Sequence, residues 1–169
     1  SLHDALPILG IEIPQNKFLI LDGAMGTVLQ QRGLSPQGRP ELLNLTEPEL
    51  LDSVYKEYIA AGSQVIYANT FGANGLKLAK TGHSVEEVVG AAIAVAKKAA
   101  AGTGTLVALD VGPLGELLEP MGTLSFERAY DLFREMAEAG AKAGADLIVV
   151  ETMTDLYEAK AALLAAKEA

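Results

Sequence analysis

The 169-residue chain contains no cysteine and no tryptophan, and it has only two histidines. Without cysteine it can build neither a disulfide framework, nor a cysteine-rich zinc module, nor a thiol nucleophile. Basic side chains are also scarce: 13 Lys and Arg stand against 22 Asp and Glu, which leaves a net charge of −9. This acidic balance argues against a nucleic-acid partner, because nucleic-acid phosphates attract basic surfaces.

Long apolar runs are missing as well. No stretch of the sequence approaches the roughly 18 apolar residues that a membrane span needs. The first residues lack the basic start and apolar core of a signal peptide. Half of all residues are nonetheless hydrophobic, which excludes a disordered chain and suits a single domain. We therefore expect a cytoplasmic protein with no membrane contact.

A short apolar strand followed by a helix recurs four times, with strand candidates at residues 18–22, 65–70, 106–110 and 147–152. Uniformly apolar strands are typical of parallel sheets covered on both faces. From the second unit on, the strands begin 41 residues apart, at residues 65, 106 and 147. Such a repeat predicts either an open doubly wound sheet or part of a (β/α)₈ barrel. The regular period, the long loops and the lack of a G-x-G-x-x-G loop favour the barrel, of which four units make about half.

Several helix starts are marked by capping residues. Thr46 and Ser84 are each followed three residues later by Glu, which predicts two capping boxes. Ser125 and Thr154 are candidate single N-caps, whose side-chain oxygens satisfy the first free N–H groups of a helix.

All four predicted strands end at polar or acidic residues, and these ends meet at the edge where both architectures bind ligands. A single Asp or Asn there is commonly a turn former, but four polar ends on one edge indicate a ligand site. A carboxylate pair could hold an ammonium group, bind a metal or act as acid and base, and the spacing does not choose between these roles. The candidate residues are Asp22, Gly23, Asn69, Thr70, Asp110 and Glu151.

Six motifs follow one another along residues 17–169: FLILDGAMGT at 18–27, NLTEPE at 44–49, YIAAG at 58–62, NTFGAN at 69–74, GPLG at 112–115 and ETMTD at 151–155. In this order they resemble the homocysteine S-methyltransferase domain, most closely the N-terminal module of cobalamin-dependent methionine synthases. Residues 1–16 match nothing in that domain and are interpreted as an unmatched leader.

The resemblance implies a (β/α)₈ barrel that binds homocysteine at its C-terminal mouth. There zinc would activate the thiol, which at neutral pH is only a few per cent ionised, for attack on a methyl donor to give methionine. The donor would be methylcobalamin or a folate, supplied by other modules of the parent protein.

Roles for individual residues also follow from the resemblance. It implies that Asp22 and Glu151 hold the homocysteine ammonium, and that backbone N–H groups near Gly23 and the Asn69–Thr70 turn face its carboxylate. The family usually has a threonine directly before the NTF sequence, where this chain has Ala68.

The zinc ligands implied by the resemblance are three cysteines on later strands of the barrel. Because this chain has no cysteine, residues 17–169 are interpreted as the N-terminal half of the barrel, with no catalytic or metal residue of its own and inactive alone. Unpaired strand edges at 18–22 and 147–152 then predict self-association.

Two other functions remain open at this point. One is a non-catalytic, doubly wound module that binds a small amine or amino acid. The other is a different barrel enzyme, such as a lyase that uses Asp22 and Glu151 as acid and base.

Overall fold

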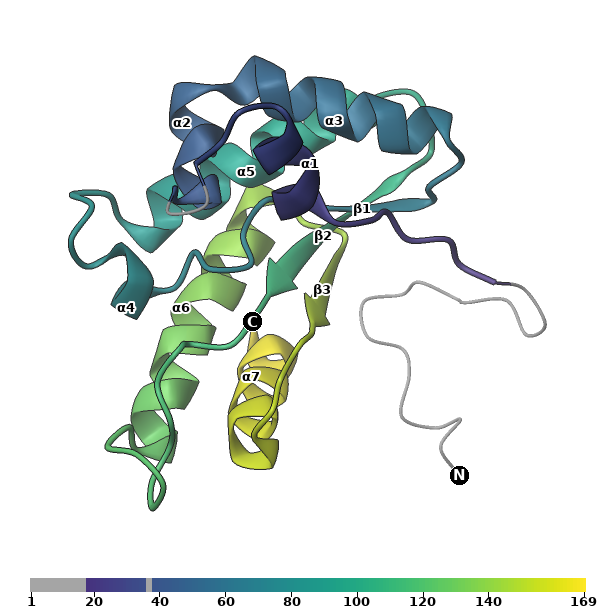
Figure 1. Ribbon diagram of the computed structural model, residues 1–169. Helices are drawn as coiled ribbons and strands as arrows, with labels where there is room; N and C mark the ends of the chain where they lie inside the picture. Colours follow the sequence, from purple (N-terminus) through teal and green to yellow (C-terminus); the bar gives the residue numbers. More distant parts are fainter. Residues whose placement is uncertain (1–17, 36–37) are drawn as a thin grey trace.

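The computed structural model describes residues 18–35 and 38–169 (Figure 1). The predicted leader, residues 1–16, lies outside the described residues. Within the described part, none of the helices combines the length and hydropathy needed to cross a membrane. The elements are α1 (Met25–Gln31), η2 (Pro40–Leu42), α2 (Leu43–Thr46), α3 (Pro48–Ala60), β1 (Val65–Tyr67), α4 (Gly75–Leu78), α5 (Val85–Ala100), β2 (Leu106–Val111), α6 (Phe126–Ala143), β3 (Leu147–Val150) and α7 (Leu156–Glu168).

The sheet contains three parallel strands in the order β1-β2-β3, so the predicted strands from 65, 106 and 147 are confirmed in slightly different lengths. Tyr67 pairs with Ala108, which in turn pairs with Leu147. The spatial order follows the sequence without reversal. A doubly wound sheet reverses its strand order at a switch point, so the sequential order favours successive units of a barrel.

The predicted strand at residues 18–22 is wrong as a full strand. It makes one parallel bridge, between Leu21 and Val65, in which the Asp22 N–H donates to the Val65 carbonyl at 3.0 Å. The next bond of a parallel ladder would run from the Tyr67 N–H to the backbone carbonyl of Asp22. That N–H donates instead to the Asp22 carboxylate, at 3.0 Å. The acidic side chain therefore ends the ladder, and the preceding Phe18 stays 95% exposed.

One face of the sheet carries the hydrophobic core. The longer helices pack against each other, α3 on α5, α5 on α6 and α6 on α7. The strand residues that join this core alternate along each strand, as Val107, Leu109 and Val111 do in β2. The intervening residues, including Tyr67 and Asp110, lie outside the core cluster and face the other way. The sheet therefore has one face for helices and one for a cavity.

Helix starts agree with the sequence at two of the four predicted caps. The hydroxyls of Ser84 and Ser125 accept N–H bonds at the starts of α5 and α6. Thr46 instead lies inside α2, where its hydroxyl donates to the Leu42 carbonyl at 3.2 Å. At α7 the cap is Asp155, one residue after the predicted Thr154, because its carboxylate accepts two N–H groups of the first turn.

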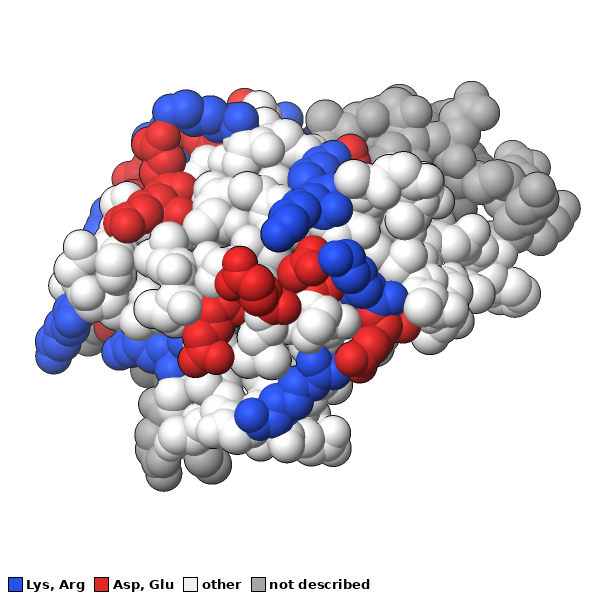
Figure 2. Space-filling model, turned by 90° about the horizontal axis from the view of Figure 1, so that it is seen from above, with Lys and Arg blue, Asp and Glu red and all other residues white. Residues whose placement is uncertain are grey.

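The outer surface mixes charges of both signs. On the face seen from above, Lys and Arg side chains alternate with Asp and Glu without a large patch of one sign (Figure 2). Ion pairs also join separate elements, as between Lys97 of α5 and Asp146, whose Nζ and Oδ1 atoms are 2.7 Å apart.

Two glycines test how closely α6 packs on the sheet. A Cβ at Gly140 would lie 2.7 Å from Leu109 Cδ2, whereas a Cβ at Gly90 of α5 would meet nothing within 4 Å. Alanine should stabilise either helix by about 1 kcal/mol through its higher helix propensity. At Gly140, overpacking costs about 1–3 kcal/mol. We therefore expect Gly90→Ala to raise the midpoint of denaturant unfolding and Gly140→Ala to leave it unchanged or lower it; equal increases would contradict the close packing.

Candidate ligand-binding site

A cavity of about 450 Å³ opens where the carboxyl ends of the strands meet. Five of the six predicted site residues line it, and only Thr70 does not. Among the described residues that line the cavity, none is Lys, Arg or His, whereas four are acidic. These acidic residues are Asp22, Glu41, Asp110 and Glu151.

Asp22 is held by the strand beside it. One carboxylate oxygen, Oδ2, accepts the Tyr67 N–H, while Oδ1 is buried without a hydrogen-bond partner in the described part of the chain. Burial and, to a smaller extent, the negative charge of Glu151 raise the pKa of Asp22 to about 6, against the opposing effect of the Tyr67 hydrogen bond. This carboxyl needs a donor that the described protein residues do not supply.

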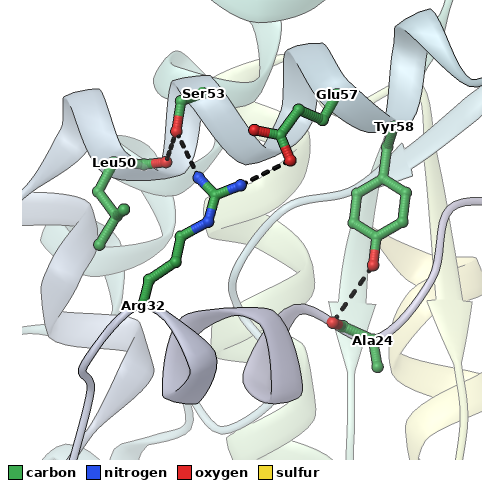
Figure 3. A network of polar contacts seen from close by, with 6 residues as sticks. All are labelled: Ala24, Arg32, Leu50, Ser53, Glu57 and Tyr58. Carbon is green, nitrogen blue, oxygen red and sulfur yellow. Dashed lines mark hydrogen bonds and ion pairs between the residues drawn. The ribbon is translucent and has the colours of Figure 1, made fainter.

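Figure 3 shows how the segment around Asp22 is fastened to α3. The Arg32 guanidinium, just after α1, donates to Ser53 Oγ at 2.8 Å and pairs with Glu57 Oε2 at 2.6 Å. The Tyr58 hydroxyl donates to the Ala24 carbonyl at 3.3 Å. A Cβ on Gly23 would lie 3.1 Å from that hydroxyl, so glycine permits this close approach.

Asp110, at the end of β2, is fixed by the fully buried Thr70. The Thr70 hydroxyl donates to the Asp110 carbonyl at 2.8 Å and accepts the Asp110 N–H at 3.0 Å. Thr70 thus stands beneath the cavity and orients a residue that lines it. Burial, together with the negative charges of Glu151, Asp22 and Glu41, raises the pKa of Asp110 to about 8.

The Asn69–Thr70 turn offers no free backbone donor. The Asn69 N–H donates to the Tyr55 hydroxyl at 2.9 Å, and the Thr70 N–H donates to the Ala68 carbonyl at 2.7 Å. The two groups that we expected to face a ligand carboxylate are therefore already hydrogen-bonded. In the described part of the chain the Gly23 N–H has no such bond.

Glu151 follows β3 at a sharp change of backbone direction. Its N–H donates to the Val111 carbonyl at 3.1 Å, and the next residue, Thr152, has a φ of 58°. A β-branched residue in this left-handed region is strained, and such strain clusters at functional sites. The Glu151 side chain makes no hydrogen bond to any described residue.

Two polar residues of the lining, Tyr67 and Glu41, escaped the sequence analysis. Tyr67 is the last residue of β1 and comes two residues before Asn69, so an alternating pattern continued past the strand would have placed both on one side. Its hydroxyl has no hydrogen bond to a described residue. Glu41 comes from η2, and one of its oxygens accepts the Gly72 N–H at 2.9 Å. No periodic pattern in the sequence connects Glu41 to the strand ends.

Comparison with known proteins agrees with this geometry. The sequence profile described as homocysteine S-methyltransferase matches residues 19–169. The chain belongs to the homocysteine S-methyltransferase family. It is 31% identical over 174 residues to methionine synthase of Mycobacterium tuberculosis (strain ATCC 25618 / H37Rv) and 30% identical to that of Mycobacterium leprae (strain TN). These alignments cover 94% of this chain but only 14% of each relative.

Solved structures of this family show the same fold. The oxidized form of the homocysteine methyltransferase MmuM from Escherichia coli matches with a TM-score of 0.77 and 30% identity, and the metallated form with 0.76 and 29%. Each match covers 89% of this chain and 60% of the MmuM chain. The strand–helix units described above therefore form about the first half of a (β/α)₈ barrel, as the repeat predicted.

The residues present do not fit a zinc site of the kind that the family resemblance implies. The chain has no cysteine to supply thiolate ligands. In the described part of the chain, no group of three or more His, Cys, Asp or Glu side chains could hold a metal ion, even though four acids line the cavity. The four acids that line the cavity therefore do not form such a zinc site.

The two raised pKa values make stability depend on pH. Asp22 and Asp110 bind protons more tightly in the folded protein, at about 6 and about 8, than at the ordinary Asp value of 3.8. The free energy of unfolding should therefore be highest near pH 4 and fall as pH rises towards 8. Asp110→Asn should flatten this decline, unlike Asp131→Asn on the exposed side of α6. Denaturant titrations from pH 4 to 9 measure the free energy of unfolding of each variant. The same decline with pH in Asp110→Asn and Asp131→Asn would contradict the raised pKa of Asp110.

Proposed function

We propose that this chain forms the homocysteine-binding part of a homocysteine S-methyltransferase that produces methionine. The observation that carries the proposal is the acidic cavity at the strand ends, in a chain of this family. An ammonium group satisfies carboxylates that have no protein donors. A ligand that carries only negative charge, such as a phosphate, would have no group to pair with the carboxylates of Asp22 and Glu151.

The homocysteine ammonium would sit between Asp22 and Glu151. Its three N–H donors match the unpartnered Oδ1 of Asp22 and the free carboxylate of Glu151. The ligand carboxylate would take the Gly23 N–H and the Tyr67 hydroxyl. Burial raises the pKa of Tyr67, so this hydroxyl stays protonated at neutral pH and can donate.

The reaction proposed for the whole protein is transfer of a methyl group to the homocysteine sulfur. Zinc bound elsewhere in the protein would supply activation of the thiol, and methylcobalamin or a folate on another module would supply the methyl group. The residues of this chain bind and orient the amino-acid end of homocysteine. This division requires the thiol to point out of the acidic cavity, away from the carboxyls that hold the ammonium.

Charge removal at the ammonium site should weaken binding of homocysteine. A hydrogen bond to a charged group contributes about 1.5–3 kcal/mol, so Asp22→Asn and Glu151→Gln should each raise the Kd by at least about tenfold at pH 7. Titration calorimetry with L-homocysteine measures the change.

Two controls separate this effect from general loss of acidity. Glu116→Gln removes one negative charge from an exposed position outside the cavity and should leave the Kd within about twofold. The deaminated analogue of homocysteine, which keeps its carboxylate and thiol, should not bind. If Asp22→Asn binds homocysteine as tightly as the unchanged chain, the ammonium assignment is wrong.

We also propose that the 169-residue chain associates with itself. Among the described strands β3 pairs only with β2, and all four of its residues are partly exposed. The following helix α7 exposes Leu156 at 82% and Leu163 at 51%. An apolar helix beside an unpaired strand edge favours association.

Sedimentation velocity tests the association. We expect the average sedimentation coefficient to rise with protein concentration, because more chains bury their exposed edges. The double variant Leu156→Glu/Leu163→Glu should reduce this rise, whereas Leu117→Glu, in the loop before α6, should not. A monomer at every concentration would exclude the proposed association.

A further inference from the structure

Asp110 is the most isolated of the cavity acids. The residue is only 8% exposed, and its Oδ1 is buried without a hydrogen-bond partner. Neither of its carboxyl oxygens accepts a hydrogen bond from a described residue, although Thr70 holds both of its backbone groups. A buried carboxylate without a donor is costly, whereas a neutral carboxylic acid needs only one acceptor for its O–H.

The groups that face Asp110 come from every element around the cavity. They are the carboxyls of Asp22, Glu41 and Glu151 and the phenols of Tyr55 and Tyr67. None of them is a cation. Together with burial they favour the protonated carboxyl of Asp110 at neutral pH.

We propose that Asp110 serves the cavity as a neutral carboxylic acid whose hydroxyl donates a hydrogen bond to the carboxylate of the bound amino acid. This role rests on the proposed function, in which Asp22 and Glu151 hold the ammonium. The two ends of the same ligand are then recognised by carboxyl groups in opposite protonation states.

The hydrogen-bond donors around the cavity show where a protonated Asp110 would contribute. The backbone N–H groups of Asn69 and Thr70 are engaged within the protein, and Ala68 brings no hydroxyl. Among the described residues that line the cavity, the Tyr67 hydroxyl and the backbone N–H groups of Gly23, Ala24, Met25 and Gly26 have no acceptor within the protein. A ligand carboxylate offers about four lone-pair sites. A protonated Asp110 adds a side-chain donor to these groups.

In the proposed pair, Asp110 is protonated and the α-carboxyl group of the ligand is ionised. An α-carboxyl group has an ordinary pKa of about 3.5, so it is ionised wherever Asp110 keeps its proton. The two Thr70 hydrogen bonds fix the backbone of Asp110 and limit where its carboxyl can turn. The pair is therefore one donor and one acceptor across the neutral range.

The pH dependence of affinity tests the proposal. L-Methionine is the probe because it has the same amino-acid end and no titrating thiol. Binding that requires a protonated Asp110, whose free pKa is about 8, should weaken about tenfold from pH 7 to pH 9 relative to a variant that cannot titrate there. Asp110→Asn is that variant, since its amide is a neutral donor that does not titrate. Because both proteins are measured with the same ligand, the titration of the ligand ammonium cancels in the comparison.

Two further comparisons make the test specific. Asp110→Ala, which has no donor, should bind methionine more weakly than Asp110→Asn at pH 7. 3-(Methylthio)propylamine, which is methionine without its carboxylate, should show no extra loss with the unchanged chain between pH 7 and pH 9. An equal pH effect for this amine would overturn the proposal, as would a pH effect that persists in Asp110→Asn.

A measurement on the unchanged chain covers the case in which Asp110→Asn does not fold. With ¹³C-labelled aspartate carboxyls, one resonance should titrate near pH 8 in the free protein, and its pKa should rise when methionine is added. A pKa that falls on binding would show that the ligand prefers ionised Asp110 and would overturn the proposal. Absence of methionine binding at every pH would contradict the proposed function itself, and with it the role of Asp110.

Discussion

Parallel pairing of strands in sequence order is the constraint on which the site depends. It brings the carboxyl ends of successive strands to one edge, so that residues some 40 positions apart become neighbours. The pairing is completed there by side chains. The Asp22 carboxylate takes the Tyr67 N–H where the first ladder ends, and the Thr70 hydroxyl joins the ends of β1 and β2 through Asp110. The same bonds that finish the sheet position the acids of the cavity.

The proposed function assigns two tasks of methyl transfer to different parts of one barrel. Holding an amino acid requires charged and polar groups around its ammonium and carboxylate, and the proposal places this task on the strand ends that line the cavity. Activating a thiol requires soft metal ligands, and the 169 residues contain no cysteine. In the proposed function, recognition of the amino-acid end and activation of its sulfur therefore lie in separate parts of the sequence.

The sequence predicted the fold well because buried parallel strands and amphipathic helices have strong periodic patterns. It failed where a side chain competes with the backbone. Residues 18–22 look like a strand, yet the Asp22 carboxylate ends the ladder after one bridge. Thr46 fits a capping box, but a short helix already includes it and its hydroxyl bonds backwards to Leu42. Such choices depend on neighbours that a local pattern does not contain.

The candidate site, too, was predictable where a periodic pattern determines it and unpredictable where neighbouring side chains do. Strand ends identified the residues that meet at the cavity, because the parallel arrangement alone requires it. The sequence did not predict which N–H groups remain free of hydrogen bonds within the protein. The Asn69 N–H, for example, donates to the hydroxyl of Tyr55, which lies on α3. Tyr67 was within reach of the alternation along β1, whereas Glu41 reaches the cavity from an irregular segment. Acidic character was predictable; the supply of donors was not.

The hydrogen-bond donors available in an acidic cavity decide which ligands it can bind. An amino acid at neutral pH is a zwitterion, so its binding site must accept hydrogen bonds at one end and donate them at the other. Four carboxylates offer acceptors only, and their mutual repulsion makes full ionisation costly. The repulsion and burial that raise the pKa of Asp110 also place a proton in the cavity. In the role proposed for Asp110, the excess of acids thus adds a side-chain donor to the backbone N–H groups and the Tyr67 hydroxyl, and an acidic lining becomes compatible with a ligand that carries both charges.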